Sequence, residues 1–417
     1  MRLHKKAYVL LMLMVAAVNQ IASAAAPQTT FLAVAGNNNL DRFIKAAAVN
    51  DDPAKRLQDY RANLDLLRRE HGGTRDMPDV RFFLFGMGSR RKMTYMNGVL
   101  KDALSGEIVK RWDVTSETIV PPAYAVFIKT KNGQSVKITE DEAGVWLEDE
   151  GRKTALSESH INLPTFAGHK YAPVLRVLHQ EILINVINGQ SGIPNYFVYS
   201  KPWYRDGAMM CMVLKETGNI DLVRSWILGL RDPFDRNNDG EAEADNLGQA
   251  LYMISLVSDK SHPLVKTILE MLPKYHEGKH IKGRSDFAEH PVYQTKWLKH
   301  GLAGLKINDP YEIPEVKDSY SPLFWWAYKD KHVNNDRFSN ENGQLYPYLV
   351  WAQDNFYGER RGVISNRDYP LSWETKASQA NYNGMLALSQ AYVDQKTSAP
   401  HTWHAAEMFL LLLKNKS

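Results

Sequence analysis

The feature that most constrains the fold is a change of sequence pattern near residue 160. Between residues 78 and 155, short apolar runs alternate with turn signals, and the Asn-Gly pair inside 131–134 is a strong hairpin signal. From about residue 171 onward, apolar residues follow helical spacing and are interrupted by Gly, Pro or Asn and Asp clusters. The pattern predicts a small antiparallel β domain at 78–160 and a helical domain at 165–417.

The helical domain divides into segments at these interruptions. Residues 246–257 are the clearest case, because their apolar positions repeat at the i, i+3, i+4, i+7 spacing of one helix face. We predict about ten such helices, over 173–187, 206–216, 220–230, 246–257, 263–273, 292–305, 323–332, 345–355, 373–394 and 402–413.

Two segments precede the predicted β domain. Residues 1–24 have the pattern of a secretory signal peptide, with a basic start, a short apolar run and an A-x-A cleavage site at 22–24. A membrane anchor is the alternative, although this apolar run is too short to span a bilayer comfortably. Residues 27–77 are predicted to form an N-terminal helical segment. We expect a periplasmic or secreted bacterial protein with no membrane span after cleavage.

Charge and cysteine content limit the classes of partner. The net charge is +4, and removal of Arg2, Lys5 and Lys6 with the signal leaves +1. This balance does not favour nucleic acid or anionic lipid as a partner. The single cysteine, Cys211, rules out an intrachain disulfide framework, and its apolar neighbours suggest a small buried side chain. Nothing in the sequence indicates the oligomeric state.

The first candidate site segment is 203–206, at the start of an apolar helix. An indole face such as that of Trp203 can stack on a sugar ring, and the Arg205 guanidinium can donate paired hydrogen bonds. Asp206 has two interpretations, because a carboxylate in a first helical turn is also favoured by the helix dipole. We expect this segment to bind substrate, with Asp206 as a candidate catalytic carboxylate.

The second segment is 232–246, which holds six carboxylates just before an apolar helix. One interpretation is a solvated loop in which Asp245 or Asn246 caps the helix and Gln249 is the reciprocal partner. Another is catalytic, with Glu243 or Asp245 as proton donor or water activator, since glycoside hydrolysis needs paired carboxylates in one cleft.

The same segment has a third interpretation as a calcium site. Its residues match the first half of a calcium-binding loop, but the twelfth position is Asn246 instead of the bidentate Glu. Calcium is therefore a possible ligand and not a required one, with candidate ligands Asp235, Asn237, Asp239 and Glu241.

The third segment, 369–382, places Trp373 and Glu374 in the first turn of a predicted helix. Glu374 would be a second carboxylate beside an indole, or a carboxylate that only complements the helix dipole. Two further aromatic residues, Tyr293 and Trp325, are candidates for binding sugar, although aromatic runs at helical spacing more often belong to a core.

Together these segments resemble the six-hairpin, or (α/α)6-toroid, glycosidase superfamily. The similarity lies in W-x-R-D at 203–206, E-A-D-N-L-G-Q at 243–249 and P-L-S-W at 370–373, within a span of about 170–417. The resemblance implies a mainly α protein, with an (α/α)6 toroid-like catalytic domain and a small N-terminal antiparallel β domain. It also implies a sugar-cleaving enzyme, often an inverting one, that requires no cofactor.

These observations lead to a mechanistic hypothesis and two alternatives. Glu243 or Asp245 would protonate the glycosidic oxygen, and Glu374 or Asp206 would activate water. An inverting pair needs its carboxyl groups about 6.5–9.5 Å apart, and a retaining pair about 5–5.5 Å. The first alternative is a polysaccharide lyase, for which His290, Tyr293 and Arg205 would matter most. The second is a glycan-binding protein without catalytic activity.

Overall fold

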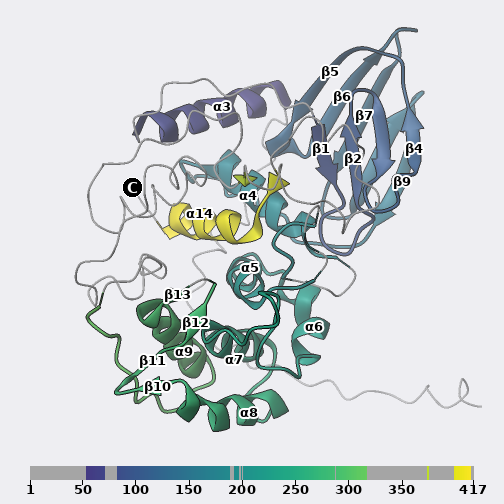
Figure 1. The fold of residues 1–417 in the computed structure, drawn as a ribbon. Coiled ribbons are helices and arrows are strands. Elements are labelled where there is room, and N and C mark those ends of the chain that lie inside the picture. Colours follow the sequence, from purple (N-terminus) through teal and green to yellow (C-terminus); the bar gives the residue numbers. More distant parts are fainter. Residues whose placement is uncertain are drawn as a thin grey trace, which may run out of the picture. The chain divides into compact units, whose positions relative to one another are not determined.

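The computed structural model describes most of the chain between residues 53 and 316 and a part near the C-terminus (Figure 1). All described residues belong to one compact unit within 43–417. The predicted signal peptide lies outside them, so export stays a prediction. In the part of the chain that is described, no helix is both long and apolar enough to cross a membrane. The described residues are 53–70, 82–187, 192–196, 199, 201–286, 288–316, 373–374 and 399–414.

The first sheet is an antiparallel meander of four strands. Its turn between β2 and β3 is the Asn97-Gly98 pair, and both residues have positive φ, at 49° and 74°. Asn and Gly tolerate this conformation, which is why the pair is favoured in two-residue hairpin turns. The strands, in sheet order, are β1 (Phe82–Phe85), β2 (Met93–Met96), β3 (Val99–Asp102) and β4 (Ile108–Arg111).

The second sheet has five antiparallel strands, also in chain order. Along β6 and β7, every second residue is buried and the residues between them are more exposed. This alternation means that one face of the sheet covers a core while the other face is open. The strands are β5 (Val114–Val120), β6 (Ala125–Thr130), β7 (Ser135–Glu140), β8 (Gly144–Asp149) and β9 (Arg152–Glu158).

A buried ion pair fixes the loop that follows β1. Glu140, at the end of β7, accepts hydrogen bonds from the backbone N–H groups of Gly86 and Met87, at 2.9 and 2.7 Å. Its Oε1 also lies 3.0 Å from Arg90 Nη1, and both side chains are fully buried. Lys92 donates to two carbonyl oxygens of this loop, and burial lowers its pKa to about 7.

The helices start and end close to where the sequence predicts them. Predicted helix 246–257 is observed as α7, and predicted helix 292–305 as α9. The described α-helices are α3 (Pro53–Glu70), α4 (Ala172–Ile184), α5 (Tyr204–Glu216), α6 (Arg224–Leu228), α7 (Asp245–Val257), α8 (Pro263–Met271), α9 (Pro291–Gly304) and α14 (Thr402–Lys414). Single 3-10 turns are η1 (Pro121–Ala123), η2 (Ile220–Val223) and η3 (Leu272–Lys274).

The predicted fold class, a mainly α protein built on an (α/α)6 toroid with a small β domain, is wrong. Residues 82–158 form two sheets with nine strands between them, which make a large β domain. Strands β4 and β9 are mostly exposed, with two apolar residues in β4 and mostly polar residues in β9, so the apolar pattern did not mark them. Short strand pairs also interrupt the helical part: β10 (His276–Glu277) with β11 (His280–Ile281), β12 (Arg284–Ser285) with β13 (Ala288–Glu289), and β14 (Trp373–Glu374) with β15 (Ala399–Pro400).

Helices α5, α7 and α9 run side by side in the same direction (Figure 1). Glycines on α7 and α9 bring these two helices unusually close: a Cβ added to Gly248 would lie 2.2 Å from the backbone carbon of Trp297, and one added to Gly301 would lie 2.6 Å from the carbonyl oxygen of Gly248. No larger side chain fits at these two positions without moving a backbone. The close contact fixes the helix ends relative to one another.

Helix α14 packs against both α4 and α5, although it lies more than 200 residues beyond α4 in sequence. The ring of Phe409 on α14 lies 6.1 Å from the ring of His179 on α4 and 5.5 Å from Phe166. Helix α4 in turn holds the β domain, because Gln180 donates to the carbonyl oxygen of Leu84 at 2.8 Å. A continuous core therefore links the first sheet, α4, α14 and α5.

His179 should make the protein sensitive to acid. It is fully buried, and burial lowers its pKa from 6.5 to about 3. Between these values the unfolded chain binds a proton that the folded protein does not, so stability is lost as the pH falls below about 6.5. The slope is about 1.4 kcal/mol per pH unit for one such group. We expect His179→Leu to flatten the pH dependence of urea unfolding between pH 4 and 6.

The exposed His160 supplies the control for this measurement. His160→Leu should leave the slope unchanged. His401 is also buried with a pKa lowered to about 3, so part of the acid sensitivity should remain in His179→Leu. An unaltered slope in His179→Leu would show that a protonated imidazole is tolerated at this position.

Candidate functional site

The N-terminal ends of α5, α7, α9 and α14 carry a shared set of polar contacts. Arg205, in the first turn of α5, binds Asp245, the first residue of α7. Gln249 of α7 lies 3.3 Å from the hydroxyl oxygen of Tyr293 on α9. Thr402 is the first residue of α14, and its Oγ1 lies 3.4 Å from Asp206 Oδ1 on α5. Because first turns carry unpaired N–H groups and the positive ends of helix dipoles, this is a place where carboxylates are stabilised.

At the centre is the Arg205 cluster, which we define as Arg205 with Glu243, Asp245 and Asp286. The guanidinium lies 3.0 Å from Asp245 Oδ2 through Nε, 3.3 Å from Glu243 Oε1 through Nη2, and 2.6 Å from Asp286 Oδ1 through Nη1. Arg205, Glu243 and Asp245 are each at most 3% exposed. One buried cation therefore holds three carboxylates from two separate segments.

A second layer of hydrogen bonds fixes Asp245. Ser285 Oγ donates to Asp245 Oδ1 at 2.6 Å, and Gln249 Nε2 donates to Oδ2 at 2.8 Å. Gln294 of α9 then donates to Ser285 Oγ at 2.9 Å. Both oxygens of Asp245 are therefore occupied, and this residue acts as the link between α7, α9 and the β12–β13 hairpin.

Glu243 differs from Asp245 in how its two oxygens are used. Oε1 accepts from the backbone N–H of Asp286, from Asn238 Nδ2 at 3.0 Å and from Arg205. Oε2 accepts no hydrogen bond from the described residues, and the Glu243 side chain is only 2% exposed. Burial, followed by the charge of Asp245, raises the pKa of Glu243. Oε2 is therefore the oxygen at which a proton would meet no competing donor among these residues.

The distances also limit how Glu243 and Asp245 could act together. Glu243 Oε1 and Asp245 Oδ2 both bind the same nitrogen of Arg205, at 3.3 and 3.0 Å. These two oxygens cannot be as far apart as the about 6.5–9.5 Å of an inverting pair. The guanidinium also occupies the space between them. Glu243 and Asp245 therefore do not have the spacing of an inverting pair in this arrangement.

The predicted capping of α7 is also wrong in detail. The N-cap position is Ala244, without a side-chain cap, and Asp245 and Asn246 are the first two helical residues. Asn246 donates to Gln249 at 3.0 Å, and its own oxygen accepts from the backbone N–H of Asp235 at 3.1 Å. These side chains connect the acidic loop to α7 instead of capping the helix.

Asp206, the residue after Arg205 on α5, contacts the start of α14. Its Oδ1 lies 3.4 Å from Thr402 Oγ1 and 3.5 Å from His401 Nδ1. Because burial lowers the pKa of His401 to about 3, this imidazole is neutral at neutral pH. Trp403, two residues after His401, has its ring centroid 5.7 Å from the guanidinium carbon of Arg205. Segments 205–206 and 401–403 thus meet, which the sequence did not predict.

Trp203 lies at the N-cap position of α5 and is partly exposed. Its ring makes an edge contact with the ring of Tyr199, at 5.6 Å between centroids. The backbone N–H of Tyr204 is satisfied by Asp235 Oδ2 at 2.6 Å, so the cap of this helix comes from the acidic loop. An aromatic surface therefore flanks the helix end that carries Arg205 and Asp206.

The candidate calcium ligands face different neighbours. Asp235 accepts from two backbone N–H groups, and Asn237 Nδ2 donates to the carbonyl oxygen of Pro202. Glu241 is exposed and pairs with Arg284 at 3.4 Å. Among the described residues, no group of three or more His, Cys, Asp or Glu side chains is arranged to hold a metal ion. Calcium binding stays a prediction without support from this geometry.

The remaining predicted residues are distributed as follows. Trp373 and Glu374 form strand β14, so the prediction that they begin a helix is wrong. Trp325 lies outside the described residues. Tyr293 is fully buried on α9, and His290, just before that helix, is also buried. Tyr293 therefore belongs to the helix packing and presents no surface to a sugar.

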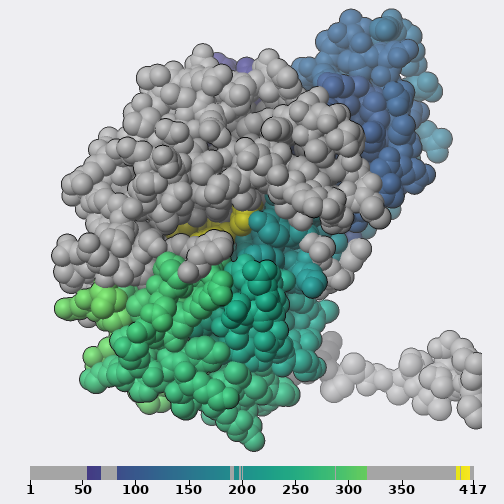
Figure 2. Space-filling view, viewed as in Figure 1, coloured from purple at the N-terminus to yellow at the C-terminus, as the bar shows by residue number. Residues whose placement is uncertain are grey.

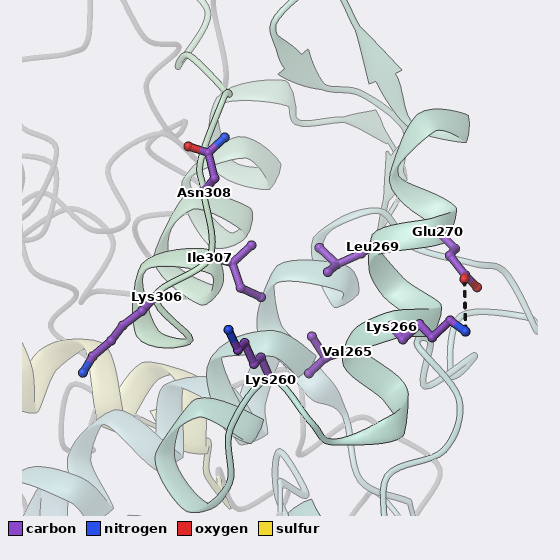
Figure 3. A pocket seen from close by; sticks show the side chains of 8 residues that line it. All are labelled: Lys260, Val265, Lys266, Leu269, Glu270, Lys306, Ile307 and Asn308. Carbon is purple, nitrogen blue, oxygen red and sulfur yellow. Dashed lines mark ion pairs between the residues drawn. The ribbon is translucent and has the colours of Figure 1, made fainter.

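A hollow of about 580 Å³ lies elsewhere, beside α8 and the residues that follow α9 (Figure 3). Val265, Leu269 and Ile307 form its apolar part, and Lys260 and Lys306 lie at its edge. None of its lining residues belongs to the Arg205 cluster. It is consequently a separate surface feature.

Ser285 and Asp286 are site residues that sequence reasoning missed. Their segment has no apolar periodicity, and the available signal was only the position of Ser285 and Asp286 shortly before a helix start. No protein-family model, curated protein or solved structure matches the chain. The description of the site therefore rests on its own geometry.

Proposed function

We propose that this protein is an exported enzyme that hydrolyses glycosidic bonds, with Glu243 as the general acid. The observation that carries the proposal is the asymmetry of the Glu243 carboxyl group, in which Oε1 is held by three donors while Oε2 accepts no hydrogen bond from the described residues. A general acid needs a raised pKa and a proton on an accessible oxygen. Burial and Asp245 supply the raised pKa of Glu243.

The neighbouring residues take different roles in this proposal. Arg205 positions Glu243 and Asp245 instead of binding the sugar directly, because its donors are already used. Trp203 offers an aromatic surface for the ring. Glu243 Oε2 gives its proton to the glycosidic oxygen as the C–O bond breaks. Water adds to the anomeric carbon and gives a proton to a second carboxylate, for which Asp206 is our candidate.

The same geometry makes the lyase alternative less suitable. A lyase needs an accessible Tyr or His as base and a free cation to neutralise a uronate carboxylate. Tyr293 is buried and hydrogen-bonded to Gln249. The charge of Arg205 is already offset by three carboxylates. Hydrolysis by a buried carboxylic acid fits these residues better.

The test is a screen of the purified protein against a glycan panel for new reducing ends, followed by Glu243→Gln on the best substrate. We expect kcat to fall by about 10²- to 10⁴-fold, the usual contribution of a general acid. Glu241→Gln is the matched control, because Glu241 lies two residues earlier and is exposed. It should leave kcat within about twofold. Equal melting temperatures would show that both variants are folded.

Three results would contradict the proposal. Full activity in Glu243→Gln would remove Glu243 from the chemistry. Ultraviolet absorbance from an unsaturated product would identify a lyase. Calorimetric binding of a glycan without either product would identify a binding protein that has no catalytic activity.

A further inference from the structure

The open face of the five-stranded sheet presents one row of side chains that crosses all five strands. The strand register pairs Thr118 with Phe127, Phe127 with Lys137, Lys137 with Glu148, and Glu148 with Lys153. Side chains directly opposite one another on paired strands share a face, and this face is opposite the buried valines and isoleucines. The row spans roughly 19 Å, from four strand spacings of about 4.8 Å.

This face carries an excess of positive charge. Lys129, Lys137, Arg152 and Lys153 line a hollow of about 590 Å³ on it, together with one acid, Glu148. Lys137 Nζ lies 3.8 Å from Glu148 Oε1, with both side chains at least 40% exposed. An exposed pair of this kind contributes little binding energy of its own. The lysines therefore remain able to bind an external anion.

Two aromatic rings lie among these cations. Lys137 Nζ is 5.9 Å from the centroid of the Phe127 ring, and Lys153 Nζ is 4.5 Å from the Trp146 ring. Both rings are partly exposed. An aromatic face can contact the C–H groups of a sugar, and the adjacent ammonium group can bind a carboxylate on the same sugar. Each of these rings has an ammonium group beside it. This arrangement suits a uronate, which is a sugar that carries a carboxylate.

We propose that the open face of the five-stranded sheet binds an acidic polysaccharide, that is, a chain of uronate residues, and holds it at the protein surface. This inference extends the proposed function by naming the charge class of its glycan. The occupant follows from charge complementarity with the lysine-rich row and from the spread of the residues that line the hollow over β5–β9. The strands concerned are part of the blue surface in Figure 2.

The experiment uses the full chain carrying Glu243→Gln, so that the polymer is not cleaved, with calorimetric titration of polygalacturonate. We expect saturable binding that weakens as sodium chloride is raised, since exposed charges are screened by salt. Lys129→Gln with Lys153→Gln should raise Kd by about tenfold, and Phe127→Ala alone should raise it by several-fold. Neutral dextran should give no saturable binding.

The double variant Lys260→Gln with Lys306→Gln is the matched control, because it removes the same charge at the other hollow. It should change Kd by less than about twofold. The proposal is overturned if polygalacturonate does not bind, if the control weakens binding equally, or if phosphatidylglycerol vesicles bind through Lys129 and Lys153 while the polymer does not. If the polymer binds and no glycan is hydrolysed, only the proposed enzymatic function fails.

Discussion

Replacing Arg205 by Met should destabilise the protein by about 3–5 kcal/mol, the usual cost of removing one partner of a buried ion pair. The change leaves Glu243, Asp245 and Asp286 close together without their cation. Such carboxylates should take up protons in the folded variant, which makes the loss smaller at pH 5 than at pH 7.5. Urea unfolding at the two pH values measures both effects.

The exposed Arg231 provides a matched control for this substitution. It donates only to the carbonyl oxygens of Leu228 and Leu230, so Arg231→Met should cost less than about 1 kcal/mol. Asp245→Asn should partly restore the stability of Arg205→Met, because it removes one uncompensated charge. If Arg205→Met and Arg231→Met were equally stable, the cluster would contribute nothing to the fold.

The second large effect should come from Arg90→Met in the β domain. Arg90 lies 3.0 Å from Glu140 Oε1 and also donates to the carbonyl oxygens of Asp141, Glu142 and Ser159. Removal leaves the buried Glu140 carboxylate without its cation and takes the arginine donors away from three carbonyl groups. We expect a loss of about 3–5 kcal/mol in the free energy of unfolding.

The adjacent Arg91 is a direct control for Arg90. Its side chain is 40% exposed and pairs at the surface with Asp102 and Glu107. Arg91→Met should therefore cost no more than about 1 kcal/mol. The two variants differ by one position in sequence, so a similar cost for both would contradict the buried ion pair as a determinant of stability.

Local sequence signals predicted most of the described helices. Predicted helix 263–273 is observed as α8, which begins at Pro263, where the missing N–H of proline costs nothing in a first turn. Predicted helix 402–413 is observed as α14, whose apolar residues are buried in the core. These helix boundaries could be predicted because they depend on local signals, namely the spacing of apolar residues and the residues that start or end a helix.

The strands were predicted less completely, and for a physical reason. β6 and β7 alternate buried and exposed residues around an Asn-Gly turn, so their pattern is visible. β9 has no buried residue, and it contacts β8 through the backbone ladder and through exposed side chains such as Lys153, which lies over the Trp146 ring. An exposed, polar strand leaves little apolar signature in the sequence, which is why the β domain was predicted to be small and the fold class was wrong.

The candidate site could be predicted only in part. Charged residues ahead of apolar helices pointed to 203–206 and 243–249, and the structure brings these segments together. The sequence could not show that Arg205 binds both Glu243 and Asp245, the two alternative candidates for the proton donor. Asp286 and the segment 401–403 were missed because contacts between distant segments depend on packing that no local pattern encodes.

The position of α14 has a consequence for how the chain folds. The apolar face of α4 is completed only when α14 packs on it, and α14 is made some 230 residues after α4 ends. At synthesis rates of about 5–20 residues per second, α4 would wait roughly 10–50 s for its partner. During that interval its buried surface, including Leu178 and Ile182, is available to chaperones. Among the described elements, the face of α4 is therefore the last surface of this core to be covered.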